Sequence, residues 1–128
     1  MTLAESATHE VDLVIFEAGG RRWAADAWDV ARVARLRERF PTASLGANPG
    51  AARALVVTDG EELAQVPIDK LVGFERVAPT ALRRLPAYAR PISSPAVAGA
   101  WLASEAIILL IDLVALAKQG AAAVPTGT

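Results

Sequence analysis

The sequence predicts a mainly β domain, a small all-β barrel with short helices. The main observation is three predicted hairpins, which turn at Gly19-Gly20, Asp59-Gly60 and Ser104-Glu105. Hairpins joined by short connections are typical of all-β barrels. The 128 residues are 53% hydrophobic and 21% charged, which is a globular composition and enough for one small core. A second full core is not expected at this length.

The first hairpin precedes a segment with helical periodicity. "VDLVIF" (11–16) runs through the glycine turn into "RRWAA", which is a strand–turn–strand pattern. In "DAWDVARVARLRERF" (26–40) the polar residues from Asp29 to Arg39 recur at spacings of three, three and four. This period favours a helix that is capped by Asp26 and ends before Pro41. A strand is the weaker interpretation, because "VARVAR" does not alternate with a period of two.

The middle of the chain predicts a loop and a second hairpin. "PTASLGANPGAA" (41–52) is rich in proline and glycine and predicts a loop. "RALVVTDGEELAQVPID" (53–69) predicts two strands, with Pro67 at a sheet edge or a bulge. "KLVGFERV" continues extended, with a bulge expected at Gly73. "APTALRRLP" (78–86) predicts a short helical turn that begins near Pro79 or Thr80.

The third hairpin ends in the most apolar stretch of the chain, "EAIILLIDLVALAK" (105–118). It is too short for a membrane span, which needs about 20 apolar residues. We expect Ile107–Ile111 to be a strand buried on both faces. Asp112 then caps a short helix, with Lys118 in its last turn and Gly120 just past its end.

The residue types argue against an enzyme. There is no cysteine, and His9 is the only histidine, so a usual zinc site is excluded. No glycine-rich phosphate loop is present. Asp69 and Asp112 form a hydrolytic pair only if their carboxyl groups lie about 5–10 Å apart in one cleft. We therefore expect no enzyme activity, no cofactor and no metal.

The charge distribution limits the partners. The net charge is −1, and two arginine-rich stretches carry seven arginines with one aromatic residue, which is unlike a nucleic-acid surface. Met1–Asp12 lacks the early basic cluster of a signal peptide. We expect a cytoplasmic protein that binds proteins, with no nucleic acid and no direct membrane insertion.

The order of these motifs resembles CheW-like domains. "LVIFEAGGRRWAADAWDVARV" is similar to the family's opening. "ALVVTDGEELAQVPIDKLVGFERVAPTALRRLP" and "AVAGAWLASEAIILLIDLVALAK" are similar to its second half with almost no gaps. The resemblance covers about residues 11–40 and 53–118, and its landmarks are Asp69, Leu82-Arg83, Pro86, Gly99 and Asp112.

The resemblance implies a noncatalytic coupling protein built as two small β-barrels. Such proteins link the cytoplasmic tips of methyl-accepting chemoreceptors to the regulatory domain of a CheA-type histidine kinase, and other CheW-like proteins are further possible partners. The implied domain boundaries are a disordered lead at 1–10, a single CheW-like domain at 11–118 and a flexible tail at 119–128.

Two departures from the family imply a short, FrzB-type member with one barrel reduced. Where this chain has residues 41–52, family members carry a Gly-apolar-apolar-Asn-Leu-Arg-Gly stretch followed by a strand pair. They also carry an acidic residue at the position of Arg32. We therefore expect an accessory adaptor and not a full bridge between receptor and kinase.

We expect partner binding in a groove between the barrel halves, at Val30, Arg32, Val33, Leu71, Gly73 and Phe74. Plain core packing is the alternative for the four large apolar residues of this set. A small ligand-binding or structural barrel, unrelated to signalling, is the alternative function, and a closed apolar cavity would favour it.

Overall fold

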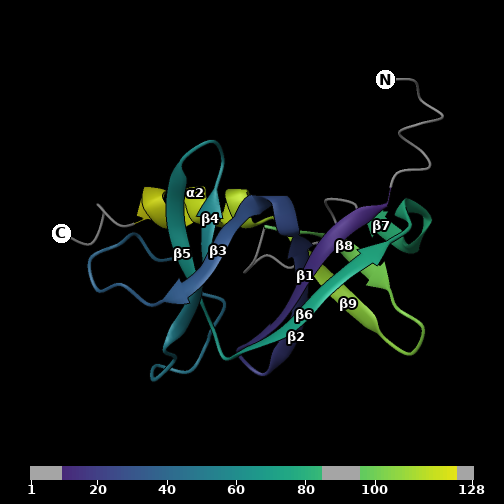
Figure 1. Cartoon of the computed structure of the whole chain (residues 1–128), viewed down its shortest axis with the longest axis horizontal. Helices are drawn as coiled ribbons and strands as arrows, with labels where there is room; N and C mark the ends of the chain where they lie inside the picture. Colours follow the sequence, from purple (N-terminus) through teal and green to yellow (C-terminus); the bar gives the residue numbers. More distant parts are fainter. Residues whose placement is uncertain (1–9, 85–95, 124–128) are drawn as a thin grey trace.

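The structure is a computed structural model that describes residues 10–84 and 96–123. Its strands form a six-stranded sheet, in the order β6-β1-β2-β9-β8-β7, and a three-stranded sheet, in the order β3-β4-β5. Figure 1 shows the two sheets beside each other, with helix α2 next to the smaller one. The elements are β1 (Val11–Ala18), β2 (Arg21–Asp26), η1 (Ala27–Asp29), β3 (Val30–Arg35), β4 (Arg53–Thr58), β5 (Glu62–Ile68), β6 (Lys70–Val77), η2 (Pro79–Ala81), β7 (Leu82–Arg84), β8 (Val97–Leu102), β9 (Ile107–Ile111) and α2 (Leu113–Ala123).

The three predicted hairpins are confirmed. β1 pairs with β2, β4 with β5 and β8 with β9, each antiparallel. In the first hairpin Gly19 and Gly20 both have positive φ, 64° and 76°, which a two-residue turn of this kind requires and which glycine adopts without a steric penalty. The 3-10 turn at Pro79–Ala81 confirms the helical turn predicted there.

The predicted irregularities of β5 and β6 also occur. Pro67 lies in β5, the edge strand of the smaller sheet, where its missing N–H costs no ladder bond on the outer side. In β6 the pairing shifts between Ile15–Gly73 and Phe16–Leu71. The shift leaves Val72 without a partner, so the strand has a bulge beside Gly73 as predicted.

The predicted helix over 26–40 is wrong. Asp26 caps a single 3-10 turn by accepting a hydrogen bond from the Trp28 N–H at 2.9 Å, and residues 30–35 then form β3. The cause of the misleading period is a second bulge, because Val30 pairs with Val57 but Arg32 already pairs with Val56. This bulge interrupts the alternation expected of a strand.

The last strand and helix depart from prediction in two respects. Ile107 is 70% exposed, so β9 is not buried on both faces along its whole length. Asp112 caps α2 as predicted, accepting a hydrogen bond from the Ala115 N–H at 3.0 Å. The helix does not stop at Gly120 but continues to Ala123. Glycine lowers helix stability by only about 1 kcal/mol, and three alanines, the best helix formers, follow it.

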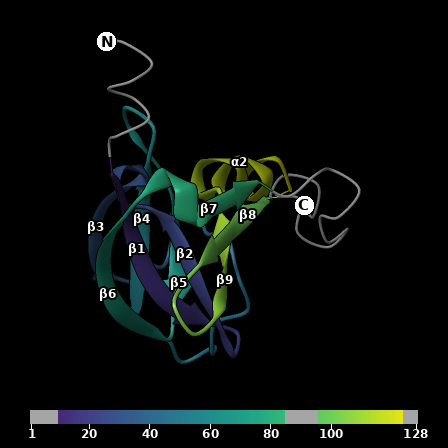
Figure 2. The ribbon, with the colours of Figure 1, turned by 90° about the vertical axis from the view of Figure 1, so that its right-hand side faces the viewer.

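Two apolar clusters make up the core. The larger lies between the two sheets and α2, around Phe16, Leu55 and Leu113, and the smaller lies on the other face of the six-stranded sheet, around Leu13 and Ile15. Figure 2 shows the six-stranded sheet curving from β6 round to β7. Neither strand order closes on itself within the described residues, so no fully closed barrel is formed there. The predicted lead, apart from Glu10, and the last part of the predicted tail lie outside the described residues. The same holds for His9 and for Pro86, one of the landmarks of the resemblance.

Candidate functional site

Three of the six predicted partner-binding residues border one core. Val30 and Val33 on β3 and Leu71 on β6 are partly buried and pack against the cluster between the sheets. β3 is the other edge strand of the smaller sheet, and β6 is one of the two edge strands of the larger. Two edge strands from different sheets therefore pack against one core cluster. Packing against the core, which was the alternative to partner binding, therefore explains part of the contacts of these three residues.

Phe74 belongs with these residues and Gly73 does not. Phe74 pairs with Val14, a member of the same core cluster, so the two side chains are on one face of the sheet. Phe74 is nevertheless 62% exposed. Gly73 pairs with Ile15, whose side chain belongs to the smaller cluster on the other face. We call Val30, Val33, Leu71 and Phe74 the inter-sheet edge.

Arg32 is engaged within the molecule and faces away from Val33. Its guanidinium forms an ion pair with Glu62, and Arg37 Nη2 lies 3.2 Å from the other oxygen of the same carboxylate. The hydrogen bond from Arg32 is the largest of several contributions from the two arginines that lower the pKa of Glu62. Arg32 therefore holds β3 to the start of β5, while about half of its side chain stays exposed.

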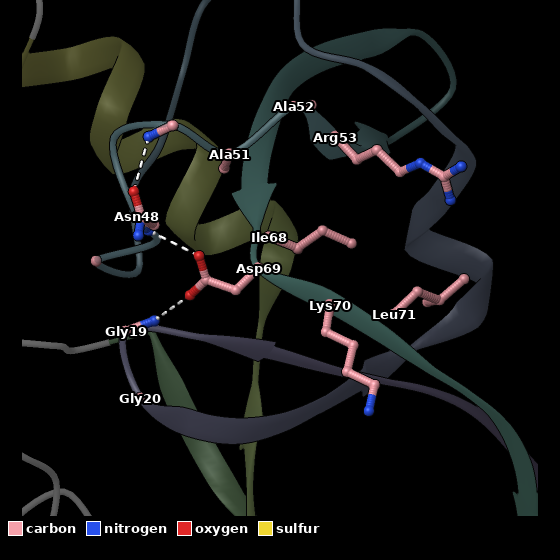
Figure 3. Close-up of a pocket in the computed structure, with 12 residues that line it drawn as sticks. Gly19, Gly20, Asn48, Ala51, Ala52, Arg53, Ile68, Asp69, Lys70 and Leu71 are labelled. Atoms are coloured by element: carbon pink, nitrogen blue, oxygen red, sulfur yellow. Dashed lines mark hydrogen bonds between the residues drawn. The ribbon is translucent and has the colours of Figure 1, made fainter.

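The sequence did not reveal an open pocket at the end of the smaller sheet where β4 begins. The turn between β1 and β2, residues 46–53 and the start of β6 enclose an open pocket of about 870 Å³. Figure 3 shows Asp69 at its centre, where its carboxylate accepts hydrogen bonds from the backbone N–H groups of Gly19, at 3.0 Å, and Asn48, at 2.8 Å. We call this site the Asp69 pocket. Its open, backbone-lined walls are unlike the closed apolar cavity that a small-ligand barrel needs.

The loop before β4 is also held by a buried side chain, that of Gln65. Gln65 is 2% exposed, and its amide accepts a hydrogen bond from the Arg37 N–H at 2.9 Å and donates one to the Thr42 hydroxyl at 3.0 Å. The Gln65 backbone bonds to Pro41 and Ala43, so this part of the loop runs along β5. The predicted loop is thus confirmed, and it covers the outer edge of β5.

The two aspartates weighed as a hydrolytic pair are not together. Asp69 follows β5 at the end of the smaller sheet where β4 begins, whereas Asp112 lies near Asp29 and Asp59 at the end where β4 finishes. Burial, followed by repulsion from Asp26, Asp112 and Asp59, raises the pKa of Asp29 to about 6. Both oxygens of Asp69 accept backbone hydrogen bonds, and Asp112 caps α2. Each aspartate thus has a structural role.

Comparison with known proteins gives a likeness in structure and none in sequence. No protein-family model and no curated protein matches the chain. The structure is similar to the crystal structure of the scaffolding protein TtCheW from Thermoanaerobacter tengcongensis, with a TM-score of 0.62 and 14% identity over 80% of this chain and 89% of that chain. The chain has a CheW-like fold. This confirms the predicted fold class, with a smaller sheet of only three strands.

No described helix has the length and apolar character needed to cross a membrane. Among residues 10–84 and 96–123, no three histidine, cysteine or acidic side chains are grouped so that they could hold a metal ion.

Proposed function

We propose that this protein is a noncatalytic adaptor of a bacterial chemosensory complex in the cytoplasm. It binds either the cytoplasmic tips of methyl-accepting chemoreceptors or the regulatory domain of a CheA-type histidine kinase, and it is a short, FrzB-type relative of the CheW-like proteins. The observation that carries this proposal is the CheW-like fold, shared with a scaffolding protein over most of both chains.

The inter-sheet edge is the receptor-binding surface in this proposal. Val30, Val33 and Leu71 are partly buried and Phe74 is 62% exposed, so the surface offers apolar area to a partner while staying attached to the core. Receptor tips are helical, and an amphipathic helix binds by placing its apolar face against such a surface. Gly73 contributes by the bulge that positions Phe74, and Arg32 by its bond to Glu62, which fixes β3.

The reduced sheet supports an accessory role. Residues 41–43 occupy the outer edge of β5 through Gln65, so no further strand can be added there without displacing them. Full-length couplers need separate surfaces for receptor and kinase. With the smaller sheet limited to three strands, this protein binds one class of partner and works beside a complete coupler.

The test is a titration of a labelled receptor-tip fragment against the wild type and two variants. Phe74→Ala removes an exposed apolar side chain from the inter-sheet edge and should weaken binding about tenfold. Ile107→Ala is the matched control, because Ile107 is 70% exposed but lies on β9. Equal binding by Phe74→Ala and wild type, with melting temperatures unchanged, would remove this surface from the proposal.

A further inference from the structure

The smaller sheet carries opposite charges at its two ends. Four aspartates lie at one end: Asp26 and Asp29 at the start of β3, Asp59 after β4 and Asp112 before α2. Asp26, Asp59 and Asp112 are close enough to Asp29 to raise its pKa. Lys118 is 3.8 Å from Asp59 and offsets part of this charge. We call this group the acidic end.

Cations collect at the opposite end of the same strands. Arg53 and Lys70 line the Asp69 pocket, and Arg35 pairs directly with Arg53 across β3 and β4. Like charges in directly opposed positions destabilise a sheet. All three side chains are exposed, and no ion pair to any of them exists among residues 10–84 and 96–123. We call these three residues the basic end.

Each end also has a shape that suits the other. At the acidic end the side chain of Trp28 is 80% exposed, on the single turn between Asp26 and Asp29. At the basic end the Asp69 pocket offers about 870 Å³ of open space beside Arg53 and Lys70. The carboxylate of Asp69 already accepts hydrogen bonds from two backbone N–H groups (Figure 3). Arg53 and Lys70 outnumber it among the charged lining residues, so the lining is net positive. An indole between cations gains cation–π attraction in addition to burial.

We infer that copies of this protein associate head to tail, with Trp28 and the acidic end of one copy seated in the Asp69 pocket and basic end of the next. The six residues of β3 separate the two ends by roughly 20 Å, so one molecule cannot satisfy its own charges. The contact joins two different surfaces and therefore builds chains or closed rings. Of the inter-sheet edge it involves Leu71 alone, which also lines the Asp69 pocket. The association is measured without any receptor, so its failure would leave the proposed receptor binding untouched.

The experiment is sedimentation velocity of the full chain over a concentration series at low and high salt. The wild type should associate, and the association should weaken as salt rises, because exposed ion pairs are screened. Trp28→Ala removes a side chain outside the core and should weaken association about tenfold with no change in melting temperature. A wild type that sediments as a monomer at every soluble concentration would overturn the inference.

A charge exchange tests the pairing of the two ends. One variant carries Arg53→Glu and Lys70→Glu, and the other carries Asp29→Lys and Asp59→Lys. Each should be monomeric alone, since it presents like charges at both ends, and an equimolar mixture should associate as the wild type does. Association of either variant alone at the wild-type level, or a mixture that stays monomeric, would overturn the inference. If a variant fails to fold, the Trp28→Ala and salt measurements decide.

Discussion

Asp69 should stabilise the protein by tying the loop before β4 to the first hairpin. Its two oxygens accept the N–H groups of Gly19 and Asn48, which are far apart in sequence. Asp69→Asn keeps the shape but removes the charge and one acceptor. Hydrogen bonds to charged groups contribute about 1.5–3 kcal/mol each, but these are exposed and water can replace the lost acceptor. We therefore expect a loss of about 1–2 kcal/mol for the pair.

The assay combines urea unfolding with amide hydrogen exchange. A loss of 1–2 kcal/mol corresponds to a fall in melting temperature of about 4–10 °C in a chain of this size. The amides of Gly19 and Asn48 should lose more protection than amides elsewhere. Asp59→Asn is the matched control, because Asp59 also follows an apolar strand but forms only a long, exposed ion pair with Lys118. Equal stability of the two variants, with protection at Gly19 retained, would refute the reasoning.

Three further perturbations probe the backbone and the charges. Gly19→Ala should lower the melting temperature more than Gly20→Ala. Both glycines have positive φ, but a Cβ at Gly19 would lie 2.5 Å from the Leu45 carbonyl oxygen, whereas a Cβ at Gly20 would meet open space. Equal losses would contradict this prediction. Asp112→Ala should lower the free energy of unfolding by about 0.5–2 kcal/mol through loss of the helix cap, and an unchanged urea midpoint would argue against the cap. Asp29 is half-buried with its pKa raised from 3.8 to about 6, so the folded state holds this proton more tightly than the unfolded state and its contribution to stability falls as pH rises from about 4 to 6. Asp29→Asn should therefore stabilise the protein at pH 7 by about 1 kcal/mol after solvent screening and lose this advantage below pH 4; an advantage independent of pH would exclude titration of Asp29 as its cause.

Features fixed by local chemistry could be predicted from the sequence. Gly19-Gly20 specifies a turn because both positions need positive φ. Asp112 specifies a helix start because its side chain bonds to an N–H three residues on. The bulge beside Gly73 and the edge position of Pro67 follow from the limits that these residues place on a ladder.

Features that depend on residues distant in the chain could not be predicted from the sequence. β3 looked helical because a bulge near Ala31 breaks its alternation, and only pairing with β4 shows it as a strand. No local pattern shows that Arg32 pairs with Glu62, which lies 30 residues further along the chain. The contacts of Asp69 span 50 and 21 residues, so the pocket around it has no local signature.

The central claim is that this protein is an adaptor that binds one class of partner and does not bridge receptor to kinase by itself. The direct test is reconstitution of the full chain with a receptor cytoplasmic fragment and a CheA-type kinase, without another coupler, followed by kinase autophosphorylation and co-sedimentation. The account predicts that one partner co-sediments with the protein and that the kinase rate is independent of receptor. Receptor-dependent control of the kinase, or co-sedimentation of neither partner, would contradict it.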